Sequence, residues 1–234
     1  MDNSKPLVSI LMSVRNSEQT VEKSIKSILN QSYDYFEFLI VDDCSTDSTL
    51  GKLKILEKQD NRISIFTNSE NIGLTKSLNK LIKNTKGELI ARQDADDISK
   101  NNRFEIQINN IINYKLDACA TRASIISSSR IVPNFSYYLP LGFVLRYKNP
   151  IIHGSLIINK DVLKKINYYD EDFLYSQDYE LIIRMYNEKF KIKILKDVLY
   201  ELNMKNNIST LNSEQQKYYA QIARNKLRYL WNYI

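Results

Sequence analysis

The sequence predicts an α/β fold with a mostly parallel central sheet and helices on both of its faces. In residues 1–98, short apolar runs alternate with segments in which apolar residues recur every three or four positions. The runs are typical of buried strands, and the spacing between them is typical of amphipathic helices. Their alternation favours right-handed β-α-β units with parallel strands.

The first two units are readily placed. The apolar run 7–12 predicts a strand, and Val21, Ile25 and Ile28 then lie on one face of a helix. The run 36–41 predicts the second strand, followed by a polar turn and a helix marked by Leu50, Leu53 and Leu56. A helix must therefore return the chain between these two strands.

Two further strands complete the predicted first half. The third is expected at 63–67, before an Asn71-Ile72-Gly73 turn and a helix whose apolar face contains Leu74, Leu78, Leu81 and Ile82. The fourth is expected at 88–93, immediately before three carboxylates, Asp94, Asp96 and Asp97. The first half therefore ends in an acidic turn.

A C-terminal helix is predicted from Ser213, with Gln216 completing a capping box. We expect a single domain over 1–210, with halves 1–98 and 99–210, and this helix over 211–234. It carries apolar and basic residues in alternation: Tyr219, Ile222, Ala223, Leu230 and Trp231, and Lys217, Arg224, Lys226 and Arg228. It is interpreted either as packed on the domain or as resting on a membrane surface.

Composition limits the function classes. No run approaches the roughly 20 apolar residues that span a bilayer. The run 7–12 is shorter than a signal peptide's apolar region and has no basic leader, and Cys44 and Cys119 have no metal or redox spacing. These features predict a cytoplasmic protein. Its net charge of +6 is spread along the chain without a nucleic-acid-binding motif, so we expect no nucleic acid partner.

Polar residues follow each predicted strand and should converge, since ligands bind at the carboxyl ends of strands in open parallel sheets. The sequence contains no glycine-rich phosphate loop. The residues that should meet are Ser13 and Arg15, Asp42 and Asp43, Asn71 and Lys76, and Asp94 and Asp96.

The acidic turn has two interpretations. It is a solvated turn in which Asp97 or Ser99 caps a helix starting near Asn102, or it is a metal site. Neighbouring carboxylates repel one another unless a cation or strong donors compensate. Mg²⁺ or Mn²⁺ would suit one or two carboxylates and would add substrate phosphates as ligands, which predicts a nucleotide.

Several motifs together resemble the family 2 glycosyltransferases of GT-A fold, which have a single Rossmann-like domain. They are the segments 8–16, 40–47, 71–74 and 94–97, and, on the acceptor side, 149–155 and 176–181 with Arg184. The resemblance covers roughly residues 6–210. It implies an inverting enzyme that uses a nucleotide-sugar and Mn²⁺ or Mg²⁺, of the bacterial polysaccharide, O-antigen or capsule type.

The resemblance also implies roles on the donor side. Asp43 would accept from the base N3–H of a uridine-type nucleotide, and Asp42 would buttress that loop or share the contact. Ser13 and Arg15 stand where the family lines the base pocket, although its usual Pro and Tyr are replaced. Asp94 would face the ribose and the metal, and Asp96 would bind the metal. Asn71 and Lys76 are further donor candidates, and Asp97 is an outer residue or a cap.

Asp178 is the candidate base that takes the proton of the acceptor hydroxyl. We expect its position at a helix start to hold it ionised, because the helix dipole favours a carboxylate there. Gln177 stands where the family has an acidic partner. The alternatives are that Asp178 only caps the helix, or that Glu180 or one of Asp170, Glu171 and Asp172 is the base.

His153, Arg184 and Lys205 are further candidates for acceptor or diphosphate contacts, together with Gln177. His153 is equally interpreted as structural, and Arg184 as a member of an ion pair. Lys205 would replace the family's C-terminal phosphate clamp, which this sequence lacks.

We therefore expect transfer of a hexose or N-acetylhexosamine from a UDP-sugar to a glycan or a lipid-linked saccharide, as in lipopolysaccharide or capsule synthesis. The protein would be cytoplasmic, or peripheral at the inner face of the plasma membrane. The alternatives are a sugar nucleotidyltransferase and a non-catalytic nucleotide-sugar-binding protein.

Overall fold

One nine-stranded sheet organises the part of the chain that is described. The computed structural model describes residues 5–205 and 212–228. Within them the strands are β1 (Val8–Val14), β2 (Phe36–Asp42), β3 (Ile63–Thr67), β4 (Leu89–Arg92), β5 (Ile98–Ser99), β6 (Ala118–Ile125), β7 (Ile131–Val132), β8 (Ile157–Asn159) and β9 (Ile192–Leu202). Their order is β3-β2-β1-β4-β8-β6-β9-β5, and β7 pairs with β6.

The first half of the sheet is parallel, as predicted. β1 runs parallel to β2 and β4, and β2 runs parallel to β3. The second half is mixed, because β8 is antiparallel to both β4 and β6 while β6 and β9 are parallel. The sequence-based expectation of an α/β fold is confirmed, and the antiparallel pairs are concentrated beyond β4.

Helices cover both faces of the sheet. They are α1 (Val21–Leu29), α2 (Thr49–Gln59), α3 (Leu74–Lys83), α4 (Arg103–Tyr114), α5 (Leu141–Val144), α6 (Lys160–Lys165), α7 (Gln177–Asn187) and α9 (Ser213–Asn225), with short 3-10 turns η1 (Phe135–Tyr138) and η2 (His153–Ser155). None of the helices described is long and apolar enough to cross a membrane.

Alternation along the strands divides the buried residues between two cores. Ile10 of β1 packs in one core with Ile25 of α1, whereas Leu11 packs in the other with Leu78 of α3. Successive side chains of a strand point to opposite faces, and burying each such aliphatic side chain stabilises the fold by about 1.5–3 kcal/mol. The apolar runs are therefore apolar throughout because both faces of the sheet are covered.

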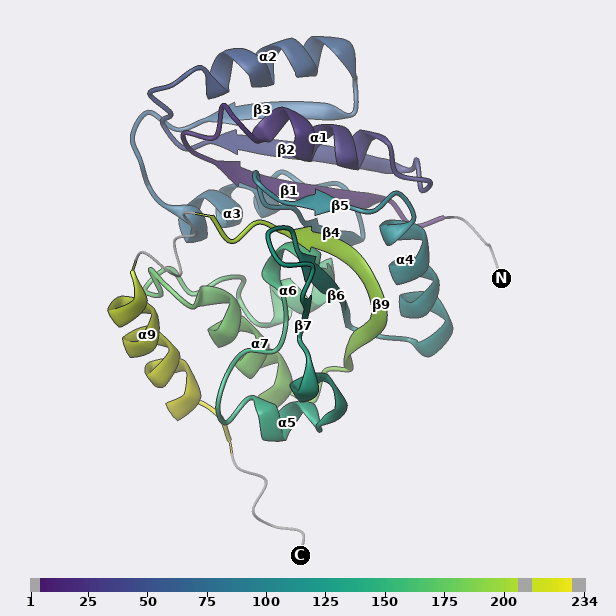
Figure 1. Ribbon diagram of the computed structural model, residues 1–234, viewed down its shortest axis with the longest axis vertical. Coiled ribbons are helices and arrows are strands. Elements are labelled where there is room, and N and C mark those ends of the chain that lie inside the picture. Colours follow the sequence, from purple (N-terminus) through teal and green to yellow (C-terminus); the bar gives the residue numbers. More distant parts are fainter. Residues whose placement is uncertain (1–4, 206–211, 229–234) are drawn as a thin grey trace, which may run out of the picture.

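The C-terminal helix α9 packs on the domain beside α7 (Figure 1). Ala223 and Leu227 are buried in the core that α7 shares, and Arg224 donates to the backbone oxygen of Tyr147 at 2.9 Å. The first interpretation of this helix is thus the one observed for residues 213–225. Leu230 and Trp231 lie outside the described residues, and contact with a membrane stays a prediction.

The capping box expected at this helix is wrong. Asn212 is the N-terminal cap residue, and its side chain accepts no capping hydrogen bond. The side chain of Gln216 instead accepts from the hydroxyl of Ser176 at 2.8 Å, at the start of α7. The side-chain amide of Gln216 therefore makes a tertiary hydrogen bond to Ser176 and not the local capping bond that the sequence pattern predicted.

Candidate active site

The carboxyl ends of the parallel strands bring the predicted polar residues to one edge of the sheet. Ser13 pairs in register with Val41, and Val14 pairs with Asp42. Leu11 pairs with Arg92, so the residues that follow β4 lie next to those that end β1. Ser13, Asp42 and Asp94 therefore occupy one edge, as the topology predicts.

Asp43 holds the loop that follows β3. Its Oδ1 accepts from Asn68 Nδ2 at 2.8 Å and from the Ile72 amide at 2.9 Å, and its Oδ2 accepts from the Gly73 amide at 2.9 Å. Asp42 accepts from the Ser45 amide at 3.1 Å, while its buried Oδ1 has no partner among the described residues. Asp42 thus supports the loop that follows β2, and Asp43 supports the loop that follows β3. The base contact stays a prediction for either residue.

Three other donor-side candidates are exposed at the same edge. Asn71 accepts from the Gly73 amide at 3.3 Å and so shapes its own turn. Lys76 lies in the first turn of α3, and Arg15 follows β1 directly. All three side chains are accessible to a ligand.

The acidic turn after β4 is compensated partly by a buried arginine. Arg92 is only 2 % exposed, and its guanidinium donates to Asp94 Oδ1 at 2.5 Å and to the Leu11 backbone oxygen at 2.9 Å. Asp94 in turn is anchored by its backbone, whose amide donates to the hydroxyl of Tyr200 at 3.2 Å and whose oxygen accepts from Ser24 at 2.8 Å. Arg92 therefore offsets part of the charge of Asp94.

Asp97 is buried and ties the acidic turn to the second half of the chain. Its Oδ1 accepts from the Asn203 amide at 2.7 Å. Burial and the charge of Asp94 raise the pKa of Asp97 to about 8. The solvated-turn interpretation is wrong for both residues it named, because Ser99 lies in β5 and the cap residue of α4 is Asn102. Asp97 is instead an internal support of the turn.

The carboxyl group of Asp96 is partly buried close to Asp94. Burial, followed by the charge of Asp94, raises the pKa of Asp96 to about 6. Among the described residues, no group of three or more His, Cys, Asp and Glu side chains could hold a metal ion. Asp94 and Asp96 together offer two carboxylates, which is the number that Mg²⁺ or Mn²⁺ takes when phosphates and water supply the other ligands.

The turn η2 places His153 and Gly154 against the acidic turn. A Cβ atom at Gly154 would lie 2.7 Å from Asp94 Oδ2, so the Gly154 backbone packs closely against the side chain of Asp94. His153 Nε2 is joined by a hydrogen bond of 2.8 Å to the hydroxyl of Tyr169. Burial, with a smaller effect from the Arg92 charge, lowers the pKa of His153 well below its ordinary value. The lowered pKa favours the neutral imidazole for His153, whose neighbour Gly154 contacts Asp94.

Asp178, at the start of α7, faces the same site. Its Oδ2 accepts from Asn149 Nδ2 at 2.8 Å, and the negative charge of Asp94 is close enough to contribute to its pKa. The backbone amides at the helix start lower this pKa, as expected, but they are not the largest effect. Burial raises the pKa of Asp178 and outweighs the hydrogen bonds from Tyr179 and Asn149 that lower it.

The remaining candidates have different surroundings. Arg184 forms an ion pair with Glu180 at 2.8 Å and donates to the Tyr168 backbone oxygen at 2.7 Å. This agrees with the interpretation of Arg184 as a member of an ion pair. Gln177 is the buried first residue of α7, beside Asp178. Lys205 is exposed beyond β9, and its amide donates to Asn203 Oδ1 at 3.0 Å. Of these three residues, only Gln177 is next in the sequence to a carboxylate of the site, Asp178.

Several site residues were missed by sequence reasoning. They are Arg92, Asn149, Tyr169 and Tyr200, each of which holds a predicted site residue by a hydrogen bond or ion pair. A role for Arg92 could have been predicted from the sequence, because a cation inside an apolar strand needs a buried partner. The other three have partners that are 16 to 106 positions away in the chain.

The comparisons with known proteins agree with this geometry. The family model described as "Glycosyl transferase family 2" matches residues 9–167. The chain is 31 % identical over 229 residues to the UDP-Glc:alpha-D-GlcNAc-diphosphoundecaprenol beta-1,3-glucosyltransferase WfgD of Escherichia coli, covering 96 % of this chain and 82 % of the relative. It is 33 % identical over 187 residues to the O-antigen biosynthesis glycosyltransferase WbnJ of Escherichia coli, covering 78 % and 72 %.

Solved structures share the fold. Staphylococcus aureus TarS 1–349 in complex with UDP-GlcNAc superposes with a TM-score of 0.77 at 21 % identity, covering 94 % of this chain and 66 % of TarS 1–349. The mannosyltransferase PcManGT from Pyrobaculum calidifontis, solved with GDP-Man and Mn²⁺, gives a TM-score of 0.73 at 16 % identity, with 92 % and 61 % covered. This chain thus spans less than two thirds of both solved chains. At these identities the likeness shows the fold, and the expected GT-A architecture is confirmed.

Proposed function

Because the chain belongs to glycosyl transferase family 2, we propose that it transfers a hexose or N-acetylhexosamine from a UDP-sugar to a bacterial surface glycan under construction. Support comes from WfgD, whose name specifies a UDP-Glc donor, and from the UDP-GlcNAc complex of TarS. Membership of this family argues against the sugar nucleotidyltransferase alternative. The reaction would take place in the cytoplasm, where UDP-sugars are the expected donors.

One observation carries the proposal. The segment 149–154 contacts two separate carboxylate groups: Asn149 donates to Asp178, and Gly154 packs against Asp94. One segment therefore links the carboxylate after β4 to the carboxylate at the start of α7, and the charge of Asp94 contributes to the raised pKa of Asp178. A donor diphosphate at Asp94 and an acceptor hydroxyl at Asp178 would meet beside this segment.

The chemistry follows from these positions. The acceptor hydroxyl oxygen forms a bond to the anomeric carbon of the donor sugar, and the bond from that carbon to the β-phosphate oxygen breaks. The hydroxyl proton passes to the carboxylate of Asp178, and UDP leaves. Attack opposite to the leaving group inverts the anomeric configuration. A raised pKa makes Asp178 a stronger base than an exposed carboxylate.

The chain's other residues orient the reactants. Asp42 or Asp43 would accept from the base N3–H, and Arg15 would stack its guanidinium plane on the base. Neutral His153 is positioned by Tyr169 beside Asp94 and would contact the acceptor or the diphosphate. Asp94 and Asp96 would hold Mg²⁺ or Mn²⁺, which would supply positive charge for the diphosphate leaving group.

Replacing Asp178 by Asn tests the proposal. If Asp178 is the base, its loss lowers kcat by about 10² to 10⁴. The matched control is Asp161→Asn, which removes an exposed carboxylate on α6 that has no proposed role in the site. UDP release from UDP-glucose and UDP-GlcNAc in the presence of acceptor is the measurement. A loss below about tenfold in the Asp178 variant would contradict its role as the base.

A further inference from the structure

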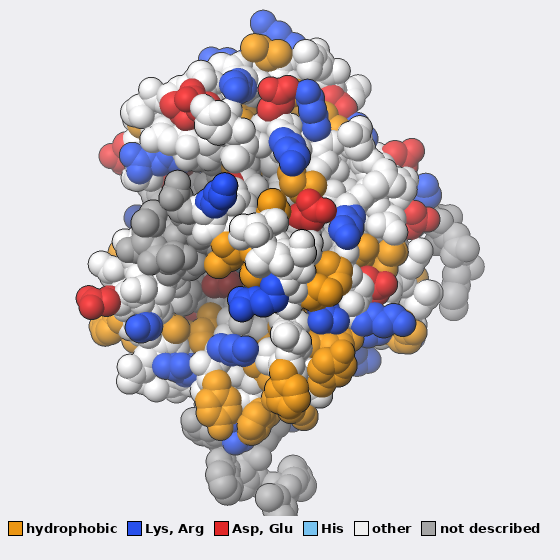
Figure 2. All heavy atoms as spheres, in the orientation of Figure 1, with side chains coloured by type: hydrophobic (Ala, Val, Ile, Leu, Met, Phe, Trp, Pro, Cys, Tyr) orange, Lys and Arg blue, Asp and Glu red, His pale blue; other side chains and the backbone are white. Residues whose placement is uncertain are grey.

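The C-terminal helix α9 contacts the chain on both sides of Asp178, the proposed base. At the place that α9 occupies in Figure 1, Figure 2 shows acidic, basic and apolar side chains together on the outer surface. The side chains that reach the domain recur every three or four positions and therefore lie on one face of the helix. They are Gln216, Tyr219, Ala223 and, just beyond the helix end, Lys226.

Ser176, the residue before α7, has a backbone conformation that serine seldom adopts. It is the N-terminal cap residue of α7, with φ 53° and ψ 24°, in the left-handed region. A serine cap ordinarily has an extended backbone, and its hydroxyl accepts from an amide of the first helical turn. Within the described residues, Ser176 makes no such capping bond. A left-handed serine persists only where the surrounding structure holds it.

Gln216 of α9 holds this serine. The Ser176 hydroxyl donates to Gln216 Oε1 at 2.8 Å and also lies 3.1 Å from the Gln216 backbone oxygen. Ser176 is buried, so water cannot readily replace this partner. The hydroxyl that would ordinarily cap α7 is therefore tied to a different helix.

Two further contacts attach α9 to the same stretch of chain. The ring of Tyr219 lies 5.9 Å from the ring of Tyr175. Lys226 Nζ lies 3.0 Å from Asp170 Oδ2 and 3.0 Å from Oε1 of the fully buried Glu180. The helix is therefore fastened both before and after the proposed base.

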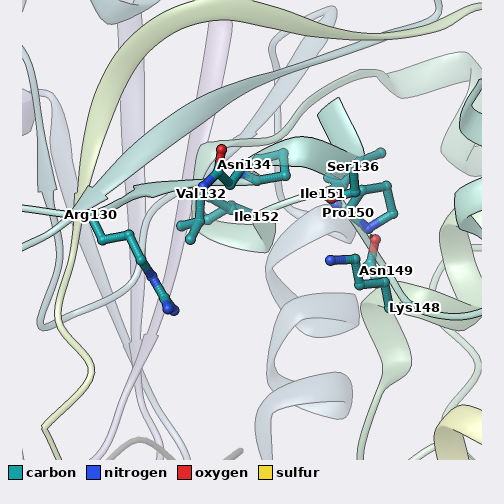
Figure 3. Close-up of a pocket in the computed structure, with 10 residues that line it drawn as sticks. Arg130, Val132, Asn134, Ser136, Lys148, Asn149, Pro150, Ile151 and Ile152 are labelled. Atoms are coloured by element: carbon teal, nitrogen blue, oxygen red, sulfur yellow. Dashed lines mark hydrogen bonds between the residues drawn. The ribbon is translucent and has the colours of Figure 1, made fainter. Parts of the chain in front are cut away.

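The carboxylate of Asp178 depends on the backbone that Gln216 holds. Hydrogen bonds from the amides of Tyr179 and of Asp178 itself reach this carboxylate from its own helix. Asn149 donates to it at 2.8 Å from a separate segment, which lines a cavity of about 340 Å³ (Figure 3). A change in the backbone of Ser176 would shift the helix start relative to Asn149 and would turn the carboxylate.

We propose that Gln216 is a positioning residue of the transfer reaction: by holding Ser176 in its left-handed conformation, it directs the Asp178 carboxylate toward the acceptor hydroxyl. Tyr219 and Lys226 keep α9 where Gln216 can do so. The inference rests on the proposed function, because it requires Asp178 to be the base.

Substitutions at Gln216 test this role. Gln216→Ala removes the side-chain acceptor without weakening α9, since alanine is the best helix former. We expect kcat for UDP release with acceptor to fall about tenfold to a hundredfold, while KM for the UDP-sugar changes less than about twofold. Gln216→Glu keeps an oxygen that accepts from Ser176 and should retain kcat within about threefold. Gln215→Ala, at the exposed neighbouring glutamine, is the matched control and leaves kcat unchanged.

Ser176→Ala removes the same hydrogen bond from its other partner. It should reproduce the loss of kcat, and the double variant with Gln216→Ala should lose no more than either single variant. All variants are assayed below their unfolding temperatures, which calorimetry gives. Additive losses in the double variant would show that the hydrogen bond is not the cause, and the inference would be wrong.

A second cycle, with Asp178→Asn, shows whether the effect passes through the base. In that background Gln216→Ala should change the residual rate less than about twofold, because there is no base left to position. An equal loss in both backgrounds overturns the inference. If Asp178→Asn lowers kcat about a hundredfold and Gln216→Ala leaves it unchanged, the inference alone fails and the proposed function stands. If Asp178→Asn costs less than about tenfold, the proposed base fails, and the role of Gln216 fails with it.

Discussion

Adding one methyl group at Gly154 should separate the two halves of the candidate active site. A Cβ atom at this position would lie 2.1 Å from Tyr200 Oη and 2.7 Å from Asp94 Oδ2, where ordinary contacts are 3.4–4 Å. Neither neighbour can withdraw easily, because Tyr200 is fully buried and Asp94 Oδ1 is held by Arg92 at 2.5 Å. In Gly154→Ala, the turn η2 must therefore move away from the acidic turn.

The magnitude follows from overpacking. Forcing an extra carbon into a packed interior costs about 1–3 kcal/mol. For a chain of this length, each kcal/mol shifts Tm by about 2–4 °C, so we expect Tm to fall by about 2–12 °C. Displacing the segment that carries His153 should also lower kcat/KM about tenfold to a hundredfold, since catalytic geometry is sensitive to shifts near 1 Å.

Calorimetry and UDP release measure the two effects, and another glycine supplies the control. A Cβ atom at Gly51 would meet no atom within 4 Å, and this residue lies inside α2. Gly51→Ala should therefore stabilise the protein by about 0.5–1 kcal/mol and leave turnover unchanged. Wild-type turnover and Tm in Gly154→Ala would refute the close contact between η2 and the acidic turn.

Three further predictions concern pH and metal. The NMR signal of His153, the only histidine, should not titrate near pH 6.5, because burial lowers its pKa; a midpoint near 6.5 would contradict its burial. Below pH 6.5 the histidine binds a proton in the unfolded chain but not in the folded chain. The free energy of unfolding should therefore fall by up to about 1.4 kcal/mol per pH unit as the pH is lowered. Urea titrations of His153→Gln should show a smaller fall. Asp178 can act as a base only when the pH exceeds its raised pKa, so kcat should rise with pH until Asp178 is ionised. A kcat that does not change from pH 4 upward would argue against Asp178 as the base. Chelation with EDTA should abolish turnover and Mn²⁺ should restore it, with Asp96→Asn raising the Mn²⁺ concentration required; full activity in EDTA would exclude the metal role of Asp94 and Asp96.

The parallel half of the fold could be predicted because its signals are local. Each apolar run is short, each helix shows its buried face in its own spacing, and α1, predicted from Val21, Ile25 and Ile28, spans Val21–Leu29. The predicted ends of the strands were less accurate. The first strand was predicted to end at residue 12, but β1 continues to Val14 because β2 pairs with it as far as Asp42. The antiparallel placement of β8 was not predicted, since its partners lie far away in the sequence.

The division of roles within the site could not be predicted from local patterns. Asp42 and Asp43 are chemically identical neighbours, and only the position of Asn68 and Gly73 in space assigns the loop to Asp43. For Asp178, the sequence showed the helix start but not the burial that raises its pKa. Both outcomes depend on contacts between residues distant in the chain.

The pair formed by Arg92 and Asp94 has a consequence for how this protein can vary. The Arg92 side chain is 2 % exposed and that of Asp94 is 33 % exposed, so removing Asp94 would leave the Arg92 guanidinium buried without its charged partner, which is strongly destabilising. Under the proposed function, Asp94 at the edge of the sheet and the buried Arg92 beneath it therefore depend on each other. Natural selection on the sugar-transfer reaction thus extends to the interior of β4, and the two positions should be inherited together.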